Sequence, residues 1–153
     1  MIGHRLRLGF SIVAIAVLAH AAPALAAKAE IYTGFLSGVA VGGYDPVAYF
    51  SEKRPVKGSG KYELEHKGAT WRFASRANLE KFRADPAAYA PKYGGYCAWA
   101  VSQGYTAKGD PQYWRIVDGK LYLNYDSTVQ ARWEKDIPGF IRKAEANWPK
   151  VLE

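Results

Sequence analysis

The stretch Tyr93-Gly94-Gly95-Tyr96-Cys97-Ala98-Trp99-Ala100 has a close parallel earlier in the 153-residue chain. The parallel is Val41-Gly42-Gly43-Tyr44-Asp45-Pro46-Val47-Ala48, so a Gly-Gly-Tyr turn occurs twice, with a spacing of 52 residues. In this register the only cysteine, Cys97, takes the place of Asp45. A motif that recurs in the same order at a long spacing indicates an internal repeat, so we expect two related units at about residues 40–91 and 92–150.

The sequence after the first turn predicts a β-hairpin followed by a helix. Residues 61–66 alternate between polar and apolar side chains, and residues 70–73 form a second β-prone run after Lys67-Gly68. Ser75 is a favourable N-cap for a helix that we expect to end near Ala84. The first unit is therefore expected to contain a loop, a hairpin and a helix in that order.

The second turn is followed by the same succession. Residues 113–117 and 120–125 flank Asp118-Gly119, a dipeptide that favours a two-residue hairpin turn. Asp126 or Ser127 can cap the helix that follows. We predict an α+β protein of two loop, hairpin and helix units packed into one small domain. The hairpins should share a core, because each unit alone is too small to bury much apolar surface.

The first 26 residues have the pattern of an export signal. Two arginines precede an apolar run at residues 8–18, and Ala24-Leu25-Ala26 matches the small-x-small pattern of a cleavage site. As a helix the apolar run spans about 16 Å, well short of the ~30 Å hydrocarbon core of a bilayer. We therefore predict a signal peptide at residues 1–26, a mature domain at 27–153, no permanent membrane span, and a periplasmic or secreted location.

Removal of the signal peptide leaves few residues that can act as metal ligands or nucleophiles. His66 and Cys97 are then the only histidine and the only cysteine, and the formal net charge of +7 falls to +5 with the loss of two arginines. A single cysteine cannot form an internal disulfide, so it is a free thiol, a metal ligand or a bridge in a homodimer. The basic residues are interleaved with acidic ones along the expected helices, so we do not expect nucleic acid as a partner.

The motifs of the chain resemble those of a known family. They are Asp45-Pro46-Val47, residues 62–66, Gly68, Trp71, Phe73, Ser75, Phe82, Asp85-Pro86 and Tyr89. This pattern resembles a YHS domain, and Gly-Tyr-Asp-Pro-Val-Ala-Tyr-Phe at 43–50 with Tyr-Gly-Gly-Tyr-Cys-Ala at 93–98 resembles the exported YHS-domain proteins of bacteria. The resemblance implies treble-clef-like units in which cysteines bind a metal, often beside copper-transporting ATPases or metal-dependent oxygenases. The implied cysteine positions hold Ala48, Ala74 and Asn78 in this sequence.

Cys97 and His66 are the candidate metal ligands that remain. A closed zinc site needs four ligands and is excluded, whereas copper in its soft form accepts fewer ligands and favours thiolate and imidazole. Asp45 is the candidate third ligand, because it occupies the turn equivalent to that of Cys97. The favoured hypothesis is therefore an exported accessory protein that binds copper or another soft metal ion near Cys97 and His66.

Two alternatives do not involve a metal. Aromatic residues near the Gly-Gly-Tyr turns predict a pocket for a small molecule or a protein partner, with Tyr44, Tyr49, Tyr96 and Trp99 as its candidate lining. A cysteine-dependent enzyme would need a base beside Cys97, and His66 is the only histidine available in the mature chain. We favour a binding protein over an enzyme.

Overall fold

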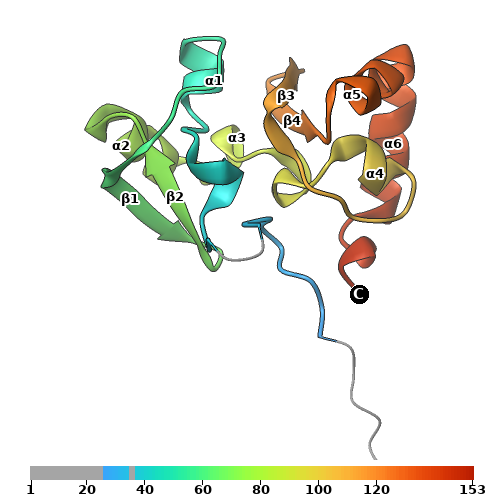
Figure 1. The fold of residues 1–153 in the computed structure, drawn as a ribbon, viewed down its shortest axis with the longest axis horizontal. Coiled ribbons are helices and arrows are strands. Elements are labelled where there is room, and N and C mark those ends of the chain that lie inside the picture. The colour runs from blue at the N-terminus through green and yellow to red at the C-terminus, as the bar shows by residue number, and fades with distance from the viewer. Residues whose placement is uncertain (1–25, 35–36) are drawn as a thin grey trace, which may run out of the picture.

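Figure 1 shows the computed structural model, which describes residues 26–34 and 37–153. The signal peptide predicted at residues 1–26 therefore lies, except for Ala26, outside the described residues. Within the described ranges, none of the helices combines the length and the apolar character that crossing a bilayer requires.

The first unit follows the predicted order of loop, hairpin and helix (Figure 1). Its elements are the 3-10 helix η1 (Ala40–Gly43), α1 (Ala48–Ser51), β1 (Ser59–His66), β2 (Ala69–Phe73), α2 (Arg76–Ala84) and α3 (Pro86–Tyr89). Strands β1 and β2 form a two-stranded antiparallel sheet. The predicted N-cap of α2 is confirmed, because Ser75 Oγ accepts a hydrogen bond from Asn78 N at 3.1 Å.

The second unit repeats this order with a longer last helix. Its elements are η2 (Lys92–Gly95), α4 (Ala98–Ser102), β3 (Asp110–Val117), β4 (Lys120–Asn124), α5 (Ser127–Trp133), η3 (Glu134–Asp136), α6 (Ile137–Asn147) and η4 (Lys150–Leu152). The predicted two-residue turn is confirmed, because Asp118 and Gly119 both have positive φ, at 48° and 71°. Asp126 caps α5 by accepting a hydrogen bond from Val129 N at 2.8 Å.

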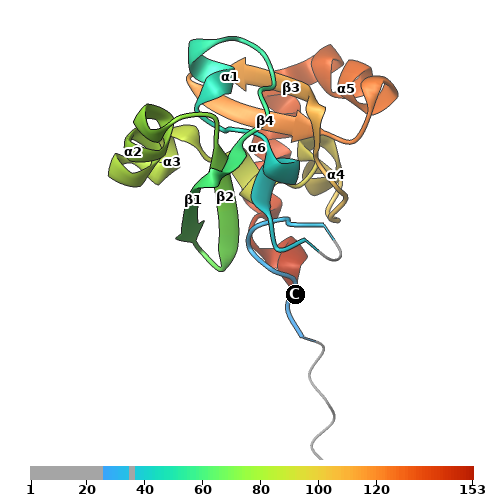
Figure 2. The same ribbon diagram turned by 60° about the vertical axis from the view of Figure 1, so that its left-hand side comes forward.

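The two hairpins correspond in detail. The register of β1 with β2 is interrupted between Ser59 and Glu63, and that of β3 with β4 between Asp110 and Trp114, at positions 51 residues further along. Figures 1 and 2 show the hairpins as separate sheets, with α2 beside the first and α4, α5 and α6 beside the second. The α+β class is confirmed, whereas the treble-clef description of the units stays a prediction.

Strand β4 joins the hydrophobic clusters of the two units. Leu121 and Leu123 are buried in the cluster that contains Trp71 and Phe73 of the first hairpin. Tyr122, which points to the opposite face of the strand, is buried in the cluster of the second unit. The expectation that the hairpins share a core is confirmed, and β4 is the wall between the two clusters.

The N-terminal lead closes against the second unit. Lys28 N donates a hydrogen bond to Leu152 O at 2.7 Å, and Tyr32 N donates one to Gly94 O at 2.9 Å. The lead passes so close to Gly94 that a Cβ atom there would lie 1.7 Å from Glu30 O. Glycine at position 94 is therefore required by the packing of the lead as well as by its φ of 61°.

Candidate functional site

Asp45 lies at the end of the first Gly-Gly-Tyr turn with its carboxylate fully buried and fully hydrogen-bonded. Oδ1 accepts hydrogen bonds from Val47 N at 2.8 Å and Ala48 N at 3.3 Å. Oδ2 accepts from Ala74 N at 2.8 Å and from Asn78 Nδ2 at 2.7 Å. A buried carboxylate with four donors around it is a structural anchor, because it ties the turn to β2 and α2.

Cys97 occupies the corresponding place in the second unit. Its side chain is 1% exposed and precedes α4, and Sγ lies 3.7 Å from Asn124 Oδ1. Burial raises the pKa of the thiol, and hydrogen bonding from the backbone N–H groups of Ala100, Tyr125 and Trp99 acts in the opposite direction, with a raised pKa as the net result. The thiol is therefore protonated at neutral pH although N–H donors surround it.

The donors around the two side chains match between the units. Trp99 and Ala100 stand 52 residues after Val47 and Ala48, which are the donors to Asp45 Oδ1. The same loop geometry therefore presents backbone N–H groups to a carboxylate in the first unit and to a thiol in the second. A thiol sulfur is a weak hydrogen-bond acceptor, so these donors are poorly matched in the second unit.

Asn124 lies against Cys97 with its carboxamide incompletely paired. The side chain is 0% exposed, and Oδ1 accepts a hydrogen bond from Trp99 N at 3.2 Å. Nδ2 has no hydrogen-bond partner among the described residues. A buried donor without a partner costs about 1–3 kcal/mol, so an unpaired amide beside a thiol calls for an explanation.

A cavity of about 390 Å³ lies beside Cys97, and we call it the Cys97 cavity. Its lining consists of Cys97, Trp99, Ala100, Tyr105, Ala107, Tyr125, Val129 and Arg132. Tyr105 is 48% exposed and Tyr125 is 43% exposed, and among the described residues they are the only large hydrophobic side chains with such exposure. The cavity thus has aromatic walls, a solvent-facing rim and Cys97 among its lining residues.

Arg132 supplies a positive charge to the same cavity. Its guanidinium lies 5.9 Å from the centroid of the Trp99 ring, in the range of a cation–π contact. Tyr105 packs edge-on against the Trp99 ring, with ring centroids 6.4 Å apart. Because the cation and both rings line one cavity, the site combines stacking surfaces with a group that attracts anions.

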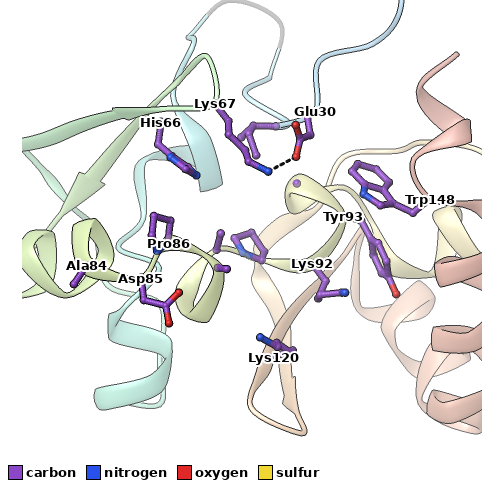
Figure 3. A pocket seen from close by; sticks show the side chains of 15 residues that line it. Glu30, His66, Lys67, Ala84, Asp85, Pro86, Lys92, Tyr93, Lys120 and Trp148 are labelled. Carbon is purple, nitrogen blue, oxygen red and sulfur yellow. Dashed lines mark hydrogen bonds and ion pairs between the residues drawn. The ribbon is translucent and has the colours of Figure 1, made fainter.

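A second cavity, of about 480 Å³, lies between the two units, and we call it the inter-unit cavity (Figure 3). His66 and Lys67 reach it from the first hairpin, and Lys92, Tyr93 and Trp148 from the second unit. Two of its lysines are already paired, Lys67 with Glu30 and Lys92 with Glu145. The His66 ring packs edge-on against Phe82, with centroids 5.8 Å apart.

The predicted metal ligands are not brought together. His66 lines the inter-unit cavity, Cys97 lines its own cavity, and Asp45 lines neither. Among residues 26–34 and 37–153, no group of three or more His, Cys, Asp or Glu side chains is placed to hold a metal ion. The expectation of one site built from these three residues is corrected by their separation and by the complete hydrogen bonding of Asp45.

The predicted aromatic lining is only partly placed at a cavity. Trp99 lines the Cys97 cavity. Tyr49 is buried with its hydroxyl donating to Pro111 O at 2.9 Å, and Tyr96 is buried with its hydroxyl donating to Ala29 O at 2.8 Å. Tyr44 packs against the first cluster. These three tyrosines are structural, and burial raises the pKa of both Tyr49 and Tyr96 above the ordinary range of a phenol.

Sequence reasoning missed two residues of the Cys97 cavity. Tyr125 follows directly after β4, and Arg132 lies in α5. The repeat register contains a signal for the first, because Tyr125 is 51 residues after Ala74, whose N–H donates to Asp45. No sequence signal identifies Arg132, which resembles the other exposed basic residues of the helices. The burial of Cys97 also leaves a disulfide-linked homodimer without an accessible sulfur.

The positions around Asp45 bear directly on the family. Ala48, Ala74 and Asn78, which the resemblance assigns to cysteine ligands, each donate a hydrogen bond to the Asp45 carboxylate. Residues 47–93 match the YHS domain. The YHS match covers most of the first unit and ends before Cys97. No curated protein and no solved structure was found to match the chain.

The segment that matches the YHS domain does not fit the metal that the family implies. The groups that converge on its centre are N–H donors and a carboxylate that already accepts four hydrogen bonds. A cation needs lone pairs from deprotonated or neutral acceptors, and the N–H groups here offer none. In the first unit a network of hydrogen bonds therefore stands where thiolates would be required.

Proposed function

We propose that the protein is a binding protein that takes a small aromatic anion into the Cys97 cavity. One observation carries the proposal: the two strongly exposed large hydrophobic side chains of the described residues, Tyr105 and Tyr125, meet at one cavity with Trp99 and Arg132. Exposed aromatic surface that is gathered at a concavity marks a binding site more often than surface that is scattered.

The chemistry of the lining defines the class of ligand. Rings of Trp99, Tyr105 and Tyr125 offer faces and edges for a planar ligand, and Arg132 offers a guanidinium for a carboxylate, sulfonate or phosphate. A volume of about 390 Å³ lies at the small end of the range for ligand pockets, so the ligand has one or two rings.

We also propose that this binding takes place outside the cytoplasm, in an exported accessory protein. The support is the signal pattern at residues 1–26, together with the resemblance of both turn motifs to exported YHS-domain proteins. The corresponding order of elements in the two units supports their descent from one treble-clef-like module.

The test is a titration of the purified protein with 2-naphthalenesulfonate, a fluorescent aromatic anion of two rings. The expected result is saturable one-to-one binding that Arg132→Gln weakens about tenfold, the effect of losing one charge-assisted interaction. Tyr125→Ala should weaken binding by a similar factor, because it removes one wall of the cavity.

The matched control is Lys120→Gln, which removes a positive charge from the inter-unit cavity instead. Binding of 2-naphthalenesulfonate should be unchanged in this variant. If Lys120→Gln weakens binding and Arg132→Gln does not, the ligand site is the inter-unit cavity and the proposal is wrong.

A further inference from the structure

The carboxylate of Asp45 provides an internal template for the site of Cys97. In the first unit a two-oxygen anion on a single methylene group accepts three backbone N–H bonds and one carboxamide N–H bond. In the second unit the sulfur of Cys97 also sits on a single methylene group. The N–H groups of Trp99, Ala100 and Tyr125, which lower its pKa, occupy the positions equivalent to the three backbone donors of Asp45, and that of Trp99 donates at present to Asn124 Oδ1 at 3.2 Å. The backbone thus offers an anion site in both units, and only the first is occupied by an anion.

The carboxamide donor of the template also has a counterpart. Asn78 Nδ2, which binds Asp45, comes from helix α2, and position 129, which is 51 residues later, is a valine. The second unit instead carries Asn124 on β4, where the equivalent residue of the first unit is Phe73. Asn124 is 0% exposed, its Oδ1 lies 3.7 Å from the Cys97 sulfur, and its Nδ2 is unpaired. The carboxamide next to the sulfur therefore has an N–H group without an acceptor, and its oxygen is the atom that faces the sulfur.

Cys97 is one of the residues that line the Cys97 cavity, so a small molecule in this cavity lies next to it. The cavity volume of about 390 Å³ is many times that of a water-sized molecule, and two half-exposed tyrosines form the rim. The thiol has no second cysteine in the chain with which to form a disulfide. A sulfenic acid formed here would have no resolving thiol, so further oxidation is the open route.

We propose that Cys97 is a modification site at which a peroxide oxidises the thiol to a sulfinate, and that this anion takes the position in the second unit that the Asp45 carboxylate has in the first. The sulfinate group has two oxygens on a methylene carbon, as the carboxylate does. It would accept the backbone N–H groups, taking that of Trp99 over from Asn124 Oδ1, and a rotation of the Asn124 carboxamide would then turn Nδ2 toward the sulfinate as its partner. This inference does not depend on binding of an aromatic anion.

The oxidation proceeds in two balanced steps with hydrogen peroxide as the oxidant. In the first, the thiol releases its proton, the thiolate sulfur attacks one peroxide oxygen, an S–O bond forms and the O–O bond breaks, and the hydroxide that leaves takes up a proton to become water. Because burial raises the pKa of Cys97, this step is slow at neutral pH. In the second, the sulfenic sulfur takes an oxygen from another peroxide molecule, which is again reduced to water. The sulfinic acid then releases its proton to solvent and remains as the anion.

The experiment treats the purified protein with hydrogen peroxide and maps the modified residue by peptide mass spectrometry. The expected product is a gain of two oxygen atoms on Cys97, with the protein still folded and with an unfolding temperature at least equal to that of the reduced form. Absence of oxidation at Cys97 in the folded protein, or oxidation accompanied by unfolding, would overturn the proposal. An oxidation product that stops at the sulfenic acid would also overturn the proposal.

A pair of variants tests the anion site without any oxidant. Cys97→Asp places a carboxylate in the second unit as in the first, and Cys97→Asn places a neutral group of the same size there. The unfolding temperature of Cys97→Asp should exceed that of Cys97→Asn, because the surrounding N–H groups favour a negative charge. The reverse order would show that the site does not accept an anion, even if both variants are less stable than the wild type. Neither outcome depends on binding of 2-naphthalenesulfonate, so failure here is separate from failure of the proposed ligand site.

Discussion

The two Gly-Gly-Tyr turns lead to side chains that have the same position and opposite character. Asp45 is an anion with four hydrogen bonds and no cavity beside it, whereas Cys97 is a neutral thiol with an unpaired amide at its side and a cavity in front of it. One copy is therefore committed to holding the fold together. The other copy retains polar groups and space that the fold does not use, which is where a binding or reactive function is to be sought.

The largest expected effect comes from removing the anion of the first unit. Asp45→Ala leaves three backbone N–H groups and Asn78 without their acceptor, and should lower the free energy of unfolding by about 3–5 kcal/mol. Cys97→Ala should lower it by only about 1–2 kcal/mol, because a small buried side chain is lost without new unpaired donors. Urea denaturation of both variants measures the difference. Equal losses would remove the contrast between the two units.

Replacing a glycine by alanine should also destabilise the protein to different extents in the two turns. Gly42→Ala puts a side chain at a φ of 57°, which costs about 1–2 kcal/mol. Gly94→Ala adds a clash with Glu30 O to the same strain, so we expect about 2–4 kcal/mol. Thermal unfolding of the two variants measures this. If Gly42→Ala proves the more destabilising, the N-terminal lead is not packed on the second turn.

The pH dependence of thiol alkylation sharpens the contrast further. Only the thiolate reacts, and burial raises the pKa of Cys97 above the ordinary value of about 8.5, while Asp126 also opposes its ionisation. Alkylation by iodoacetamide should therefore be slow at neutral pH and should still accelerate above about pH 8.5. The unfolded protein is the control, and its alkylation rate should reach a plateau once the pH passes about 8.5. A plateau at lower pH in the folded protein would mean that the N–H groups outweigh burial.

The last comparison separates Cys97 from His66. Copper(I) binding should be lost in Cys97→Ser and unchanged in His66→Ala, because the two side chains line different cavities. Titration of both variants with a competing copper(I) chelator measures this. Equal loss of copper(I) binding in the two variants would support the hypothesis of one metal site built from both residues.

Local sequence signals predicted the elements of the fold because each depends on neighbouring residues. Ser75 could be identified as a cap and Asp118-Gly119 as a turn without knowledge of the rest of the molecule. The site was harder to predict because it depends on packing between elements. Tyr49 and Trp99 are both aromatic residues just after a turn, but the first is buried with its hydroxyl bonded to Pro111 O, and a cavity lies beside the second. The repeat placed Asp45 and Cys97 in equivalent positions, and equivalence says nothing about the distance between them.

The hydrogen bond from Lys28 to Leu152 bears on the order in which the protein is made. Lys28 leaves the ribosome long before Leu152 does, so its N–H group has no partner until synthesis has passed Leu152. Each hairpin can form as it emerges from the ribosome, but the hydrogen bond between the N-terminal lead and the last turn can form only after residue 152 has emerged. A nascent chain stalled before that residue should therefore expose its lead to proteases even when both hairpins have folded.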